Sequence, residues 1–195
     1  MFSVNSALNV IRSRLKDQNY RDLRFSDAEI LDAINTIAAQ LIVEFKLNKA
    51  QQTRQIGPNN RFIQCPYLLC VLEAKFNNAI LYNRTDLDNA TEVSLLVQGS
   101  RLGVSPASMG TLSVVYCAYE PLSDVAEFLP LPPIASQAVV YGVLSLLLEI
   151  PTDEQNYQKI GILKNLYHEA KNLLAMHLNS LFSRAQNCQS KVVRV

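Results

Sequence analysis

The stretch Phe25-Ser26-Asp27-Ala28-Glu29-Ile30 contains the start of a helix around which the rest of the chain can be organised. Ser26 is a favoured N-cap residue, and Glu29 stands three residues later, where its side chain can complete a capping box. Phe25 and Ile30 occupy the two positions of a hydrophobic staple. Beyond this start, apolar residues recur at every third or fourth position. This period is typical of an amphipathic helix, so we predict a helix from about residue 26 to about residue 46.

Three further segments also have a helical pattern. Residues 4–16 form a shorter amphipathic segment, with Arg12 off its apolar stripe. Residues 134–149 follow two prolines and are apolar on nearly all sides, which predicts the central and most buried helix. A fourth helix, capped by Thr152 and Gln155, is predicted from residue 153 to about residue 183.

Between residues 49 and 121 the pattern changes to one typical of strands. Short runs rich in β-branched and aromatic residues alternate with turn signals such as Gly57-Pro58-Asn59-Asn60. The clearest run ends at Glu120-Pro121, because proline cannot donate to a sheet. We therefore predict a small sheet with short strands, which lie at 51–56, 61–64, 68–76 and 112–119.

The segment Gln98 to Gly110 has the composition of a loop. It contains three glycines, three serines and one proline. This composition predicts an exposed and mobile loop at the edge of the sheet. It is not a phosphate-binding loop, because no Gly-Lys-Ser/Thr sequence closes it.

Together these segments predict a fold that is mainly α with a small β insertion. The expected architecture is a bundle of about four helices, a short-stranded sheet and a C-terminal extension. The expected organisation is a helical hairpin (1–48), a β-rich insertion (49–121), helices that complete the bundle (122–183) and a tail (184–195). The net charge of +1 over 195 residues does not indicate a general nucleic-acid binder.

The most apolar run, residues 134–150, is 17 residues long and contains Ser136, Gln137, Ser145 and Glu149. A bilayer span needs about 20 predominantly apolar residues. We therefore interpret the run as a buried core helix and expect no membrane partner.

The residues that could carry chemistry are sparse and scattered. No two of the four cysteines are separated by the two residues typical of zinc sites. His168 and His177 are nine residues apart on one predicted helix and therefore point in opposite directions. We accordingly expect no catalytic, cofactor or metal site.

The C-terminal segment 184–195 is basic and ends in a strand-forming sequence. It carries Arg184, Lys191 and Arg194, no acidic residue, and the terminal sequence Val192-Val193-Arg194-Val195. One interpretation is a frayed terminus, as most domains have. The other is a segment that adds a strand to the edge of a partner's sheet.

Two blocks of sequence resemble the head–tail adaptor (connector) proteins of tailed bacteriophages. The first is Leu15-Lys16-Asp17 followed by 24–35, which resembles a family segment of the form W/F-S/T-D-x-E-L-L-x-x-L/I-N. The second is Tyr116-Cys117-Ala118-Tyr119-Glu120-Pro121, followed by Leu129-Pro130-Leu131-Pro132 and the two predicted helices after it. Residues 77–110 depart from the family's pattern.

The resemblance implies a homo-oligomeric, dodecameric ring beneath the portal, in the virion and, during assembly, in the host cytoplasm. Such a ring extends the channel through which DNA passes and gives the tail proteins their docking surface. The resemblance also implies that the C-terminal segment reaches the portal protein through Arg184, Lys191, Val192, Val193, Arg194 and Val195. We expect the residues that face the tail or the channel to lie in the predicted loop, at Ser100, Arg101, Leu102 and Met109.

Two alternative functions remain open at this point. One is a virion-associated cell-wall hydrolase in which Glu120 or Asp124 acts as the acid, which would require a cleft and a carboxyl group of raised pKa. The other is a different ring-forming tail-completion protein, which the helical outer blocks disfavour.

Overall fold

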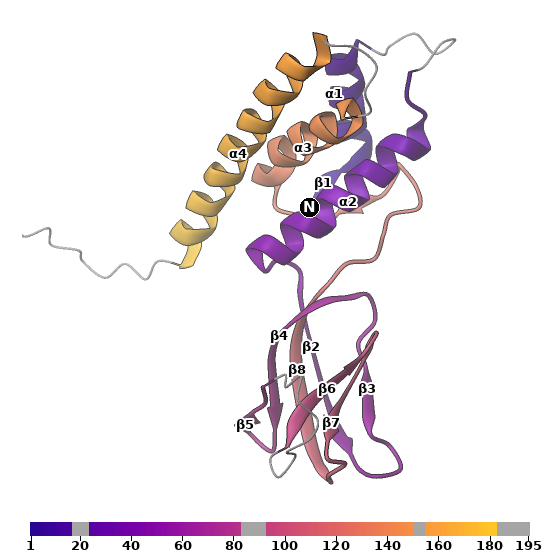
Figure 1. The fold of residues 1–195 in the computed structure, drawn as a ribbon, viewed down its shortest axis with the longest axis vertical. Coiled ribbons are helices and arrows are strands. Elements are labelled where there is room, and N and C mark those ends of the chain that lie inside the picture. The colour runs from indigo at the N-terminus through magenta and orange to yellow at the C-terminus, as the bar shows by residue number, and fades with distance from the viewer. Residues whose placement is uncertain (17–23, 83–92, 150–154, 183–195) are drawn as a thin grey trace, which may run out of the picture.

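The computed structural model describes residues 1–16, 24–82, 93–149 and 155–182. Their elements form two modules placed end to end, a helical module and a sheet module (Figure 1). The sheet module is inserted in the sequence between the second helix and the third. Thr152 and the tail 184–195 lie outside the described residues, so the predictions that concern them stay predictions.

The helical module contains the four predicted helices. They are α1 (Val4–Leu15), α2 (Asp27–Phe45), α3 (Ser136–Leu148) and α4 (Gln155–Phe182), with a short 3-10 helix, η1 (Pro133–Ala135), before α3. Helices α1, α2 and α4 all contact α3, and nine of the thirteen residues of α3 are buried. The prediction that this segment is the central helix is therefore confirmed. A two-residue strand before α1, β1 (Phe2–Ser3), pairs with β9 (Phe128–Leu129).

The start of α2 is capped as the sequence predicts. The hydroxyl of Ser26 accepts a hydrogen bond from the Glu29 amide at 3.2 Å, and the Glu29 carboxylate accepts one from the Ser26 amide at 2.7 Å. The hydrogen bonds that the Ser26 amide and, at 2.8 Å, the Ser26 hydroxyl donate to the Glu29 carboxylate lower the pKa of Glu29. The capping box therefore defines where α2 begins.

Arg12 differs from its predicted place off the apolar stripe of α1. Its side chain is buried, donates a hydrogen bond to the Phe25 carbonyl at 3.1 Å and forms an ion pair with Asp27. The guanidinium can be buried here because these acceptors at the start of α2 satisfy it. Arg12 thus ties α1 to the capped end of α2.

Gly142 allows α3 to lie close to its neighbours. A Cβ atom at this position would come within 2.9 Å of the Ile37 side chain and 3.0 Å of the Tyr167 ring. Both distances are shorter than ordinary van der Waals contacts. The absence of a side chain at Gly142 therefore lets both α2 and α4 approach α3 closely at this position.

The sheet module consists of two antiparallel sheets. The first has the order β2-β8-β4-β5 and the second the order β3-β7-β6. Their inner faces enclose a second core of twelve buried residues, separate from the core of the helical module. The strands are β2 (Lys49–Ile56), β3 (Phe62–Gln64), β4 (Leu68–Phe76), β5 (Ala79–Ile80), β6 (Ser94–Gln98), β7 (Arg101–Ser105) and β8 (Gly110–Ala118).

The expectation of a mainly α fold with a small β insertion is wrong. Nine strands in three antiparallel sheets lie within the described residues, and β4 and β8 are nine residues long. The chain is an α+β protein, because its strands form a module with a core of its own. A single sheet would leave one apolar face in water. Strands β6 and β7 cover this face, and the sequence pattern predicts no strand in either segment.

The predicted loop 98–110 is also corrected. Residues 101–105 form strand β7, which pairs with β3 and β6, and Gly99 and Ser100 make the tight turn before it. Position 103 requires glycine because the strands pack closely there: a Cβ atom would lie 2.7 Å from the Arg61 carbonyl oxygen. Gly99 has a different role, because its φ of 58° is required by the turn.

The connection between the modules is made of two paired strands. Strand β2 enters the sheet module from α2, and β8 leaves it, and the two pair antiparallel from Lys49↔Cys117 to Ile56↔Gly110. At the junction, Asn48 donates a side-chain hydrogen bond to the Ala118 carbonyl at 2.6 Å. The connection is a continuous ladder of hydrogen bonds, which is stiffer than a single-strand linker.

Candidate functional site

The structure does not bring together the four residues expected to face the tail or the channel. Ser100 and Arg101 lie at one end of β7, and Met109 lies beyond its other end, where it is 79% exposed. The Ser100 hydroxyl accepts a hydrogen bond from Gln64 at 2.7 Å. Leu102 is wrong as a contact residue, because its side chain is fully buried in the core of the sheet module.

The two carboxylates considered for a hydrolase take part in local interactions near the junction of the modules. The exposed Glu120 accepts a hydrogen bond from the Tyr67 hydroxyl at 2.6 Å, and this contact raises the pKa of Tyr67. Asp124 is exposed and accepts a hydrogen bond from the Ala126 amide at 3.1 Å. Glu120 therefore joins the residue before β4 to a residue after β8, and Asp124 stabilises a local turn.

The described residues include no group of three or more His, Cys, Asp or Glu side chains that could hold a metal ion. Cys117 is buried beside Cys70, and burial together with this neighbour raises the pKa of Cys117 to about 11. Burial also raises the pKa of Cys65. These thiols are therefore protonated at neutral pH and behave as small apolar side chains. In the part of the chain that the structure covers, no helix has the length and apolarity of a membrane span.

The outer face of α4 is the first of two apolar surfaces exposed by the structure. Helix α4 packs on α3 through its inner face, where Ala170 and Leu174 are buried. Its outer face exposes Ile162 (61%), Leu173 (53%) and Met176 (68%). At 100° per residue these three side chains fall within about 60° of one another. We call this set the outer α4 face.

Helix α4 is held firmly to the rest of the module. Lys171 forms an ion pair with Glu44 of α2 at 2.7 Å, and its ammonium group lies 5.2 Å from the centre of the Tyr167 ring. Burial, with a smaller contribution from Glu44, raises the pKa of Tyr167 to about 12. These contacts fix the orientation of α4 on the rest of the module.

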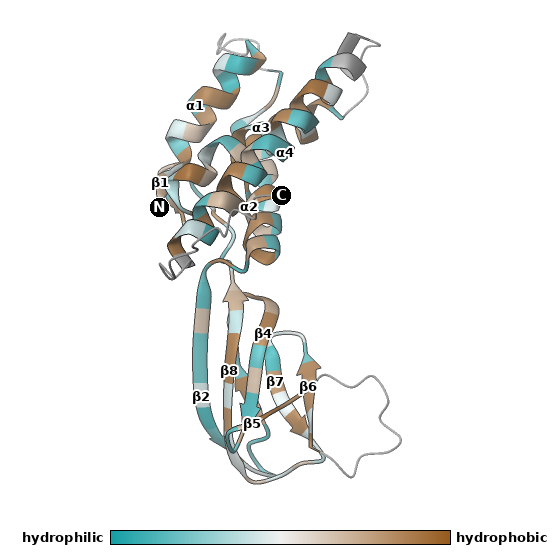
Figure 2. Ribbon diagram, turned by 90° about the vertical axis from the view of Figure 1, so that its left-hand side faces the viewer, coloured by the Kyte–Doolittle hydropathy of each residue, from teal (hydrophilic) through white to brown (hydrophobic). Residues whose placement is uncertain are grey.

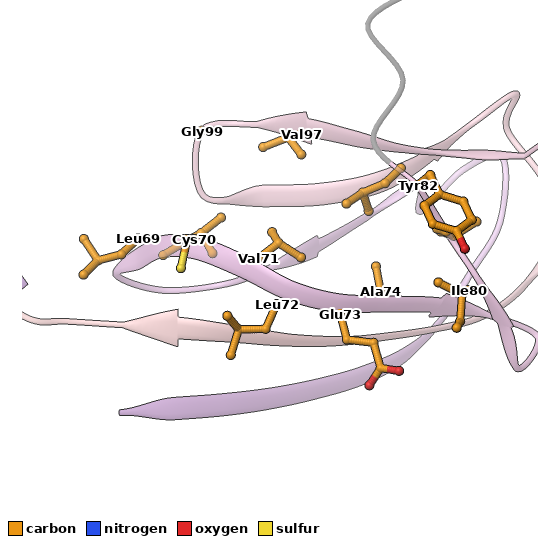
Figure 3. Close-up of a pocket in the computed structure, with 13 residues that line it drawn as sticks. Leu69, Cys70, Val71, Leu72, Glu73, Ala74, Ile80, Tyr82, Val97 and Gly99 are labelled. Atoms are coloured by element: carbon orange, nitrogen blue, oxygen red, sulfur yellow. The ribbon is translucent and has the colours of Figure 1, made fainter. Parts of the chain in front are cut away.

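The second apolar surface is a groove in the sheet module, with a volume of about 790 Å³, between β4 and β6 (Figure 3). Beyond Lys75 and Phe76, which pair with β5, the outer edge of β4 has no paired strand among the described residues. Strand β6 is likewise an edge strand. We call this feature the open-edge groove. It is lined by Leu68, Leu69, Cys70, Val71, Leu72, Glu73, Ala74, Ile80, Leu81, Tyr82, Leu95, Val97 and Gly99.

Comparison with known proteins adds no relative. No protein-family model matches the chain, and a search of curated proteins finds no match.

Sequence reasoning did not identify either surface. The outer α4 face has a signal in the sequence, because the separations of Ile162, Leu173 and Met176 (11 and 3 residues) follow the period of the helix. For the open-edge groove, the sequence indicates only one wall, through the predicted strand 68–76. The opposite wall is β6, and no strand is predicted for that part of the sequence.

Proposed function

We propose that this chain is a structural subunit of a homo-oligomeric ring that joins the head of a tailed bacteriophage to its tail. The observation that carries the proposal is the outer α4 face. Three large apolar side chains on one exposed helix face, on a helix anchored by its other face, are typical of a surface that another protein covers. A second copy of the same chain is the partner that is always present.

The sequence resemblance supports the ring as the form of the assembly. It rests on the segment that contains the capping box, and on the order of strand, proline-rich link and two helices in the second half. A contact between different surfaces of identical subunits closes into a ring when the rotation between neighbours allows it. The resemblance implies twelve subunits.

The two-module architecture suits a connector. The helical module offers the copy-to-copy surface, and the sheet module projects from it on a paired-strand connection (Figure 1). In a ring, this arrangement would place identical sheet modules at one end. The exposed Met109, which adjoins the Ile56↔Gly110 pair at the end of the sheet module farther from the helices, then becomes a candidate contact for tail proteins.

Electron microscopy tests the proposal. The full chain is imaged alone and mixed with portal rings produced from the same genome. We expect the chain to form rings, and we expect one such ring to bind coaxially to each portal ring. Particles that stay monomeric in the presence of portal rings, with portals unchanged, would contradict it.

A further inference from the structure

The two edges of the first sheet differ in a way that indicates different uses. Strand β2 forms one edge and is hydrophilic along most of its length (Figure 2), with Lys49 and Arg54 exposed. Charged and polar side chains on an edge strand discourage pairing with other strands. The edge formed by β4 carries Leu69-Cys70-Val71-Leu72 instead. Two bulges interrupt the pairing of β4 with β8, between Leu68 and Cys70 and between Val71 and Glu73, so this edge is apolar but irregular.

The groove next to this edge has the form of a strand-binding site. Strand β4 is paired with β8 on one side, and from Leu68 to Glu73 its other side faces the groove. Across the groove stands the β6–β7 hairpin with Val97 and Gly99 (Figure 3). On the outer side of β6, the Leu95 amide donates to the Tyr82 carbonyl at 3.2 Å. An extended segment placed here would gain backbone hydrogen bonds from β4 and apolar contacts from both walls.

The groove also displays large apolar side chains that an incoming strand would cover. Tyr82 is 72% exposed and Ile80 is 56% exposed, and both line the groove. The floor is made of Ala74, Leu81 and Leu95, which belong to the core of the sheet module. A strand in the groove would therefore extend this core. Glu73 is the one charged residue among the described lining residues, and its carboxylate forms an ion pair with Lys75 at 2.7 Å.

We propose that residues 184–195 of the same chain occupy the open-edge groove as an added strand in the free protein. The segment ends Val192-Val193-Arg194-Val195 and has three basic residues and no acidic ones. β-branched residues suit a strand. This inference goes beyond the proposed function and holds whether or not a ring forms.

The position of α4 places the segment within reach. Both ribbon views show the C-terminal end of α4 directed toward the sheet module, on the side of β4 (Figures 1 and 2). Thirteen residues, 183–195, follow Phe182, and a chain of this length spans roughly 40 Å when extended. A tethered segment experiences an effective concentration of about a millimolar. Binding within one chain is therefore favoured over binding between chains.

Hydrogen exchange of the full chain tests the proposal, with two variants at one position. Val193→Pro removes an amide donor and disfavours a strand, whereas Val193→Thr keeps both the donor and the β-branch. We expect residues 68–73 and 184–195 to be protected in the natural chain and in Val193→Thr. In Val193→Pro, both segments should exchange at least tenfold faster. The same rates for 68–73 in all three proteins would overturn the proposal.

Two further measurements distinguish binding within one chain from binding to a neighbouring copy and from binding to the portal. Protection of 68–73 that is independent of protein concentration supports binding within one chain, and protection that grows with concentration would assign the groove to a neighbouring copy and overturn this assignment. In the second arm, portal rings are added to the full chain. Protection of 184–195 that appears only with portal rings would overturn the proposal and assign the segment to the portal.

Discussion

The side-chain oxygen of Asn35 in α2 accepts a hydrogen bond from the Tyr119 hydroxyl at 2.7 Å, although 84 residues separate them in the sequence. The same Asn35 oxygen accepts from the Leu122 amide at 2.9 Å, and its NH₂ group donates to the Leu122 carbonyl at 3.0 Å. Asn35 therefore holds the chain where it returns from the sheet module. Together with the β2–β8 pairing, it joins the two modules into one unit.

Substitution of Asn35 tests this junction. Asn35→Ala removes all three hydrogen bonds and leaves the buried Tyr119 hydroxyl without this partner. An unsatisfied buried polar group costs about 1–3 kcal/mol, so we expect the free energy of unfolding to fall by about that amount. Urea titration measures it. Asn9→Ala removes an exposed asparagine on α1 and serves as the control. If both variants lose equally little stability, Asn35 does not hold the junction.

Two glycines should respond in opposite ways to the same substitution. Gly142→Ala gains about 1 kcal/mol of helix propensity, but the new methyl group meets Ile37 and Tyr167, and overpacking costs about 1–3 kcal/mol. We therefore expect a net loss of stability of about 1 kcal/mol. A Cβ atom at Gly161 meets nothing within 4 Å, so Gly161→Ala should be stabilising. Melting temperatures measured for both variants decide the matter, and a stabilised Gly142→Ala protein would show that α3 is not closely packed there.

The packing of α2 on the core predicts the effect of a third substitution. Ile34 is fully buried, and Ile34→Ala should cost about 2–5 kcal/mol through lost burial and a cavity. Val43 lies on the same helix but is 43% exposed, so Val43→Ala should cost much less. Denaturant titration compares the two. An Ile34→Ala protein as stable as Val43→Ala would contradict the placement of α2.

The buried Tyr119 and the half-buried Tyr167 should make the protein sensitive to high pH. Burial raises the pKa of Tyr119 and that of Tyr167 to about 12, with smaller contributions from Glu127 and Glu44 respectively. A tyrosine in the unfolded chain has a pKa of about 10. The neutral hydroxyls therefore contribute fully below pH ~10, and their contribution is lost as the pH rises from about 10 toward about 12.

Unfolding measured at several pH values between 9 and about 12 checks this expectation. The free energy of unfolding should decrease across the upper part of this range. Tyr167→Phe, which has no hydroxyl to ionise, should show a smaller decrease than the natural chain. Parallel curves for the two proteins would rule out Tyr167 as a source of the effect.

The four helices could be predicted because their signals are local. The capping box of α2 lies within four consecutive residues, and the apolar character of α3 is continuous in the sequence. Strands β2, β4 and β8 were likewise visible as runs of strand-forming residues. The two-residue strands β1 and β9 were not, because they are too short for a period and pair across more than 120 residues.

The missed features depend on contacts between distant segments. In β7, Leu102 and Val104 are buried at alternate positions, but Gly99, Gly103 and Ser100 favoured a loop when composition alone was considered. The helical pattern places Arg12 off the apolar stripe of α1, and it does not reveal the burial of Arg12 because the acceptors belong to the start of α2. The open-edge groove could not be predicted at all, since it arises from the spatial arrangement of two sheets.

The most direct test of the central claim is the mass of the assembly formed by the natural chain and by a variant of the outer α4 face. Sedimentation velocity of the natural protein should show a large closed oligomer, and Leu173→Glu combined with Met176→Glu should reduce it to a monomer that keeps its helical content. Gln51→Glu combined with Gln55→Glu, which adds the same two negative charges on the exposed strand β2, should leave the oligomer intact. An oligomer of unchanged mass in the α4 variant would contradict the assignment of this face as the contact between copies.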